Sequence, residues 1–79
     1  MFKAHLVHIS DRVLHDDYAE RVVLPGVLGE FEVADLHVPI VSLLAKGSLS
    51  VYTKERSVSF NIHQGLMRFD GTELTAVVE

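Results

Sequence analysis

Hydrophobic and polar residues alternate with a period of two along much of the chain, most clearly in its second half. Val58, Phe60 and Ile62 alternate with serine and asparagine, which is the pattern of a strand with one buried and one solvated face. Residues 48–52 alternate in the same way, and the polar residues 53–56 between the two segments are suited to a turn. The two segments are therefore predicted to form a β-hairpin.

A second hairpin is predicted nearer the end of the chain. Residues 66–69 and 73–78 are rich in hydrophobic residues, and the pair Asp70-Gly71 lies between them. Such a pair accepts the positive φ angles that a tight two-residue turn requires. We therefore expect this pair to form the turn of the hairpin.

Three shorter segments supply further strands. Residues 3–9 are rich in residues that favour β-structure. Residues 21–24 form a short strand that Pro25 is expected to end. Residues 40–44 are compatible with a strand or with one helical turn, and their short length favours the strand.

Short strands at this spacing predict an all-β fold: a small flattened β-sandwich or barrel of mainly antiparallel strands. With 79 residues the chain has room for one core, because two would each fall near the size at which folding needs metals, disulfides or partners. No linker, repeat or change of composition interrupts it. We expect a single domain over residues 1–79.

Composition restricts the classes of function. The chain contains no cysteine, which excludes disulfides, cysteine-based zinc sites and thiol catalysis. Its net charge is −4 and its seven lysines and arginines are spread along the chain, so neither nucleic-acid binding nor a polybasic lipid contact is expected. The first residues lack the apolar stretch of a secretory signal, and no run approaches the ~20 apolar residues of a membrane span. A cytoplasmic protein that binds another protein is the expectation.

Five histidines are the first candidates for a metal or catalytic site: His5, His8, His15, His37 and His63. On a strand, residues 5 and 8 point to opposite faces, and no His-Glu-x-x-His pattern is present. Convergence of three histidines in space, as in a cupin-like site, stays open beside the simpler interpretation as surface and interface histidines.

Acidic residues gather at Asp16, Asp17 and Glu20, which we expect to lie in a solvated polar loop rather than to form a catalytic carboxylate pair. No serine lies in a Gly-x-Ser-x-Gly motif, and no phosphate-binding loop or dinucleotide fingerprint is present. The sequence therefore predicts no catalytic site, no metal site and no cofactor.

The most informative run is Leu24-Pro25-Gly26-Val27-Leu28-Gly29-Glu30-Phe31. Pro25 fixes its own φ, and the two glycines permit backbone angles closed to other residues. The run is typical of a tight corner between strands. An acid and an aromatic residue presented on a rigid corner would also suit protein recognition.

This run resembles a signature of the epsilon subunit of F-type ATP synthases, in its N-terminal β-sandwich domain. Residues 24–33 match every fixed position of Leu-Pro-Gly-x-x-Gly-Glu-Phe-x-Val. The next block of the signature, Leu-Pro-Gly-His-Ala-Pro-Leu-Leu, keeps His37 and Pro39 but has Ala34-Asp35-Leu36 before the histidine, and the block Leu-Lys-Pro-Gly lacks its proline. The likeness covers nearly all of the chain.

The resemblance implies a non-catalytic subunit of the central stalk, the rotor of the ATP synthase, which binds the gamma subunit and the membrane c-ring. Carried over by position, the loop that contacts the c-ring is Gly26, Val27, Leu28, Gly29, Glu30 and Phe31, and the residues that contact gamma are His37, Val38 and Pro39. Family members commonly add a C-terminal helical hairpin, and we expect this chain to be a short form without it. The expected location is peripheral, at the cytoplasmic face of the bacterial inner membrane, with membrane association only through the complex.

Two other functions remain open on the sequence alone. One is a free-standing β-sandwich adaptor that shares the corner but binds another protein. The other is a small metal-dependent β-barrel enzyme that uses the histidines. The resemblance favours the rotor subunit over both.

Overall fold

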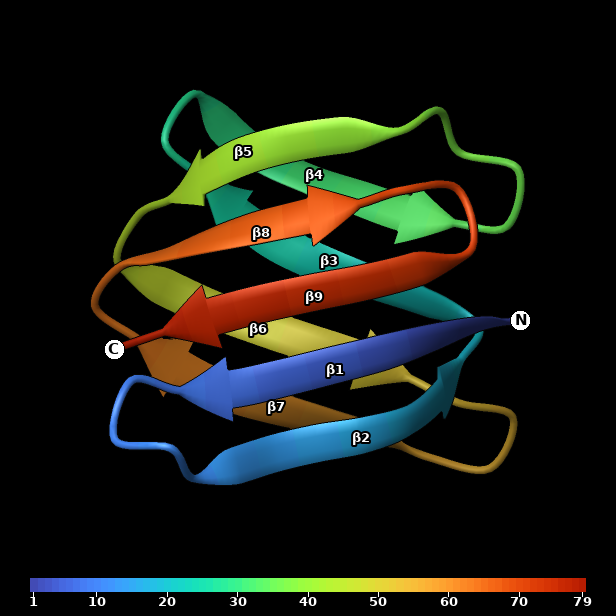
Figure 1. Cartoon of the computed structure of the whole chain (residues 1–79), viewed down its shortest axis with the longest axis horizontal. Helices are drawn as coiled ribbons and strands as arrows, with labels where there is room; N and C mark the ends of the chain where they lie inside the picture. The colour runs from blue at the N-terminus through green and yellow to red at the C-terminus, as the bar shows by residue number, and fades with distance from the viewer.

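The computed structural model of the chain is a β-sandwich in which two layers of strands face each other (Figure 1). The strands are β1 (Phe2–His8), β2 (Val13–Ala19), β3 (Arg21–Gly26), β4 (Gly29–Ala34), β5 (Ile40–Leu44), β6 (Gly47–Tyr52), β7 (Ser57–Ile62), β8 (Gly65–Phe69) and β9 (Glu73–Val78). β5, β8, β9, β1 and β2 form the layer nearer the viewer in Figure 1, which we call the front layer. β4, β3, β6 and β7 form the back layer. None of the elements is a helix that could span a membrane.

The two layers are parts of one curled sheet. β3 of the back layer meets β5 of the front layer at a single register pair, Gly26 with Leu44. All neighbouring strands are antiparallel except β1 and β9, which pair in parallel. The predicted fold class, an all-β sandwich of mainly antiparallel strands, is confirmed.

The core between the layers consists of 16 buried residues, all of them apolar. The largest fully buried side chain is Phe69 of β8, followed by residues from both layers such as Leu6 of β1 and Leu24 of β3. The three residues of β7 that were predicted to face inward, Val58, Phe60 and Ile62, alternate with exposed residues as expected. Ile62 is buried, whereas Val58 and Phe60 are only half-buried, because β7 lies at the edge of its layer.

Both predicted hairpins are present, and the turn of the second differs from the prediction by one residue. The Asp70 N–H donates to the Glu73 carbonyl over 3.1 Å, so the two central residues of the turn are Gly71 and Thr72 rather than Asp70-Gly71. Gly71 has a φ of 105°, which suits the first central position of a tight hairpin turn. Asp70 instead closes the turn with its side chain.

Pro25 does not end β3, as the sequence pattern predicted. The strand continues to Gly26, and the Pro25 carbonyl accepts a hydrogen bond of 2.7 Å from the Ala45 N–H. β3 pairs with β6 only as far as Val23. Pro25 therefore lies beyond that ladder, where the N–H that proline lacks removes no bond to β6.

β2 and β4 are strands that the sequence pattern did not predict. Asp16 and Asp17 were expected in a polar loop, but both lie within β2. Only Ala19 of that strand is buried, so β2 carries no alternation that would reveal it. It is specified by pairing with β1 along its whole length, with a bulge opposite Leu6 and Val7.

Candidate docking surfaces

The corner predicted from the Leu24-to-Phe31 run is the tight turn of the β3–β4 hairpin. The register pairs Gly26 with Gly29, which leaves Val27 and Leu28 as the two turn residues. A Cβ added at Gly26 would lie 2.8 Å from the Gly29 carbonyl oxygen and 2.8 Å from the Phe31 ring. Gly29 has a φ of 135°, where other residues are strained. Both glycines therefore have a structural reason to be there.

The corner presents aliphatic side chains and one acid. Leu28 is fully exposed and Val27 is 54% exposed. Glu30 is exposed, as expected. Phe31 is not presented beside it, which corrects the prediction, because its ring lies over Gly26 and packs against the core. Leu28, which the resemblance assigns to the ring-contacting loop, is the most exposed apolar residue of the corner.

The corner is held in place by hydrogen bonds to the end of β5. The Val27 N–H donates to the Leu43 carbonyl over 3.1 Å, and the Ala45 N–H donates to the Pro25 carbonyl over 2.7 Å. These bonds tie the β3 side of the turn to the end of β5 (Figure 1). The corner is thus held rigidly against the front layer.

The loop between β4 and β5 holds the residues that the resemblance assigns to gamma. Val38 and Pro39 are exposed. His37 is half-buried, with its ring edge-on to Phe69 at a centroid distance of 6.1 Å. Its Nδ1–H donates to the Val38 carbonyl over 2.6 Å, since a carbonyl only accepts. His37 therefore fixes the loop, while its two successors face solvent.

Leu36 has the least favourable backbone conformation in this loop. Its φ is 69°, in the left-handed region that costs a residue with a Cβ about 1–2 kcal/mol. Its side chain is 99% exposed. The family signature has glycine at this position, so the chain keeps a left-handed backbone there with a leucine in place of the glycine.

The outer face of the front layer carries a row of aliphatic side chains that crosses all five strands. The strand registers place its members opposite one another: Leu43 of β5, Leu66 of β8, Val77 of β9, Val7 of β1 and Val13 of β2. We call this set the apolar row. Four of the five are 45–61% exposed, and Val7 is half-buried.

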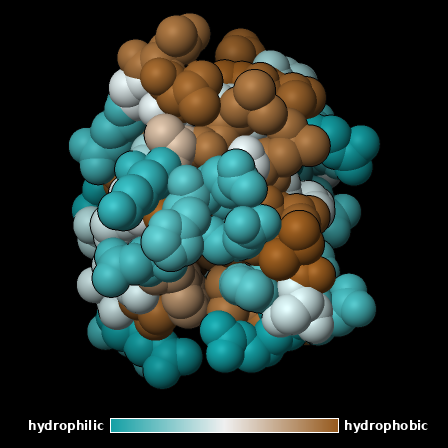
Figure 2. Space-filling view, turned by 90° about the vertical axis from the view of Figure 1, so that its left-hand side faces the viewer, coloured by the Kyte–Doolittle hydropathy of each residue, from teal (hydrophilic) through white to brown (hydrophobic).

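The apolar row is continuous with the corner. Val27 and Ile9 line the same shallow depression as three members of the row. Figure 2, which views the end of the sandwich that carries the β3–β4 turn, shows hydrophobic residues gathered in the upper part of that end. The sequence analysis did not predict this surface, because it depends on strand order and register.

The outer face of the back layer is polar by comparison. The hydroxyls of Ser50 and Ser59 lie 2.9 Å apart across β6 and β7. Arg21 pairs with Glu32 over 2.9 Å and stacks on the Tyr52 ring with 3.8 Å between its Cζ and the ring centroid. The two outer faces therefore differ in kind, and the front face is the one suited to an apolar contact.

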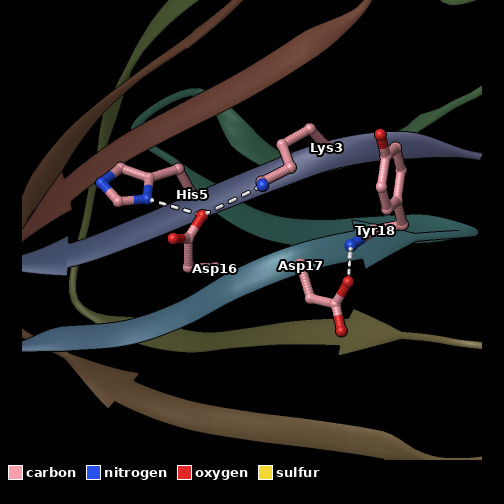
Figure 3. Close-up of polar contacts among 5 residues, drawn as sticks. All are labelled: Lys3, His5, Asp16, Asp17 and Tyr18. Atoms are coloured by element: carbon pink, nitrogen blue, oxygen red, sulfur yellow. Dashed lines mark hydrogen bonds and ion pairs between the residues drawn. The ribbon is translucent and has the colours of Figure 1, made fainter.

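The acidic residues do not form a catalytic pair. Asp16 and Asp17 are consecutive residues of β2, and their side chains point in different directions (Figure 3). Asp16 receives a hydrogen bond from His5 Nδ1 over 3.2 Å and has Lys3 Nζ at 3.6 Å. Its pKa is lowered, first by the bond from His5 and then by the charge of Lys3. A general acid needs a raised pKa, so Asp16 is unsuited to that role.

The five histidines lie in separate surroundings. His5 bonds Asp16 on β1, His8 Nδ1 lies 2.8 Å from the Ser10 hydroxyl, and His37 packs on Phe69. His63 is exposed, and His15 has an Nε2 that is buried without a hydrogen-bond partner. No group of three or more His, Cys, Asp or Glu side chains is placed to hold a metal ion.

The fold and these surfaces define a small β-sandwich domain with two exposed loops at the ends of β4 and one apolar outer face. The family model for the ATP synthase delta/epsilon chain β-sandwich domain matches residues 1–79. The chain belongs to this family. The resemblance drawn from residues 24–33 is thereby confirmed.

Relatives and solved structures agree with this assignment. The chain is 35% identical over 68 residues to an ATP synthase epsilon chain of Sulfurovum sp., covering 85% of this chain and 53% of the relative. It is 24% identical over 76 residues to the epsilon chain of Pelagibacter ubique, covering 96% and 58%. The chain thus spans about half the length of the curated relatives it matches.

Two solved structures share the fold. One is a chain of the central stalk and c-ring structure of the Tetrahymena thermophila mitochondrial ATP synthase, with a TM-score of 0.80 and 14% identity over 98% of this chain and 62% of that chain. The other is a chain of the Euglena gracilis mitochondrial ATP synthase, with a TM-score of 0.89 and 19% identity over 98% and 49%. At such identities the likeness concerns the fold alone.

Proposed function

We propose that the chain is a rotor subunit of an F-type ATP synthase, without catalytic activity of its own, that couples the gamma subunit to the membrane c-ring during ATP synthesis driven by a proton or sodium gradient. The observation that carries this proposal is the family match over the whole chain. The surfaces described above support it, because they offer exposed loops and an apolar face for contacts with other subunits.

The positions of the two loops suit a coupling role. The corner Gly26 to Phe31, proposed to contact the c-ring, includes the start of β4, and the loop His37 to Pro39, proposed to contact gamma, follows its end. Strands rise about 3.3 Å per residue, so the six residues of β4 place the Val27-Leu28 turn roughly 20 Å from the start of the β4–β5 loop. One short strand in a close-packed sandwich therefore joins both contacts, and a rigid link of this kind transmits torque.

We infer that the front layer is the side that faces gamma. The gamma loop leads directly into β5, whose exposed Val41 and Leu43 lie on the same outer face as the apolar row. Apolar surface buried against a partner contributes about 25 cal/mol per Å². The serine-rich back face offers no comparable area. The subunit would then be held at the membrane through the complex alone, at the cytoplasmic face in a bacterium, and would need no cofactor.

A capture experiment tests the proposal and the choice of face together. The tagged chain is incubated with detergent-solubilised membranes from its source, and captured gamma and c subunits are quantified. We expect the wild type and Ser59→Glu, which adds a charge to the back face, to capture both. Leu66→Glu, which adds the same charge to the apolar row, should capture much less gamma at an unchanged melting temperature, because residue 66 is half exposed.

Two outcomes would count against these statements. Failure of the wild type to capture either gamma or ring components would overturn the proposed function and favour an adaptor for another protein. Capture of gamma by the wild type and by Leu66→Glu in equal amounts would show that the front face is not the one that faces gamma.

A further inference from the structure

Leu36 combines a strained backbone with a side chain that takes no part in the fold. A φ of 69° is uncommon for any residue with a Cβ and is a marked outlier for a bulky one. At 99% exposure the side chain makes no packing contact that would stabilise this conformation. Glycine would adopt the same angle without strain. Strain that the fold itself does not use suggests a functional role for the residue.

The neighbours of Leu36 are held in place on both sides. The Asp35 carboxylate forms an ion pair with the amino group of Met1. The His37 N–H donates to the Ala34 carbonyl over 3.1 Å, and the His37 ring packs on Phe69, which is itself 1% exposed. The turn is thus fixed to the sandwich, and Leu36 stands out from it in a defined position. Because the backbone of the turn is already fixed, little backbone entropy is lost when a partner covers the side chain.

We propose that Leu36, together with the exposed Val38, is an apolar anchor that inserts into a hydrophobic pocket of the gamma subunit. This rests on the proposed function, in which the loop from His37 to Pro39 faces gamma. Anchors of this kind, a projecting apolar side chain that fills a pocket, carry a disproportionate share of binding energy. Leu36 is therefore a specificity-determining residue of this chain at a position where the family signature has none.

A second copy of the chain is a less suitable occupant. Each copy has a net charge of −4, and Asp35 lies directly beside the anchor, so two copies would meet with like charge. Self-association is nevertheless measurable, and it is included as an outcome of the test.

The test compares binding and stability in variants that remove the anchor. In Leu36→Gly and Leu36→Asn the apolar side chain is lost, while both residues accept the left-handed conformation. The control is Lys54→Asn, a change at an exposed residue of the β6–β7 turn, which lies outside both proposed contacts. Affinity for purified gamma is measured by isothermal titration calorimetry, the melting temperature by circular dichroism, and the mass in solution by sedimentation.

We expect both Leu36 variants to bind gamma about tenfold more weakly or worse, with a melting temperature that is unchanged or higher because the strain is relieved. Lys54→Asn should bind gamma like the wild type. If the wild type binds gamma and the Leu36 variants bind it with the same affinity, the inference is overturned and the proposed function stands. Absence of binding by the wild type would overturn the proposed function and, with it, the inference.

Three further results would also contradict the inference. An equal loss of affinity in Lys54→Asn would show that the loss does not depend on the anchor. A lower melting temperature in both Leu36 variants would show that the side chain serves the fold. A wild-type dimer that dissociates in Leu36→Gly would assign the anchor to a second copy of the chain.

Discussion

Asp70 shows how one exposed residue specifies a turn. Its Oδ1 accepts hydrogen bonds from the N–H of Thr72 at 2.9 Å, the N–H of Glu73 at 2.8 Å and the hydroxyl of Thr72 at 3.0 Å. These bonds, led by the Thr72 N–H, hold the pKa of Asp70 below its usual value of 3.8. The sequence indicated a turn at Asp70-Gly71, but the role of Asp70 as an acceptor beside the turn required the hydrogen bonds to be seen.

Replacing Asp70 by asparagine should destabilise the protein in a pH-dependent way. The folded pKa lies below the unfolded one, so the ionised carboxylate stabilises the fold above about pH 3.8, and the effect is lost as pH falls through the folded pKa. Asparagine resembles the protonated acid. We expect Asp70→Asn to melt below the wild type at neutral pH, and the difference to shrink as the pH is lowered below 3.8. A difference in melting temperature that is independent of pH would contradict this account.

Leu36 is the residue that sequence reasoning had least chance of finding. A leucine that replaces glycine in a signature predicts a different loop, whereas the structure keeps the left-handed angle. Exposure at Leu28 was equally hidden, because a hydrophobic residue between two glycines is normally expected to contact something. Both follow only from the backbone geometry of turns that no hydrophobic alternation describes.

Strands with one buried and one solvated face were found from their alternation, the edge strand β7 among them, whereas β2 and β4 were not. β6, β7, β8 and β9 pair as the pattern predicted. β2 buries only Ala19 and β4 only Val33, so neither has the repeated inward positions that mark a strand in sequence. Each of these two strands forms because a neighbouring strand pairs with it, so its own sequence gives little sign of it.

The β3–β4 corner allows a charge test of the proposed ring contact. Glu30 is exposed and makes no ion pair within the chain, so Glu30→Lys should leave the melting temperature nearly unchanged. Capture of the c-ring at low salt should weaken by about two- to fivefold, as expected for an exposed charge pair. Glu55→Lys makes the same change of charge in the exposed β6–β7 turn and should capture the ring normally. Equal capture by both variants would remove Glu30 from the ring contact.

At the scale of the whole molecule, the sandwich presents surfaces of different character around one core. The corner and the β4–β5 loop lie at opposite ends of one strand, and the apolar row crosses the front layer beside them. The sequence predicted the family and the fold class from one signature and a period of two. It did not predict the apolar row, since five residues scattered between positions 7 and 77 become neighbours only when the strand order is known.

The most direct test of the coupling role is ion pumping by the complete ATP synthase with and without this chain. The complex is prepared from source membranes after depletion of the chain, reconstituted into vesicles, and assayed for ATP hydrolysis and for ATP-driven ion uptake, before and after the chain is added back. We predict that the depleted complex hydrolyses ATP with little ion uptake, and that adding the chain restores uptake. Full uptake by the depleted complex would contradict the claim that this domain joins gamma to the c-ring.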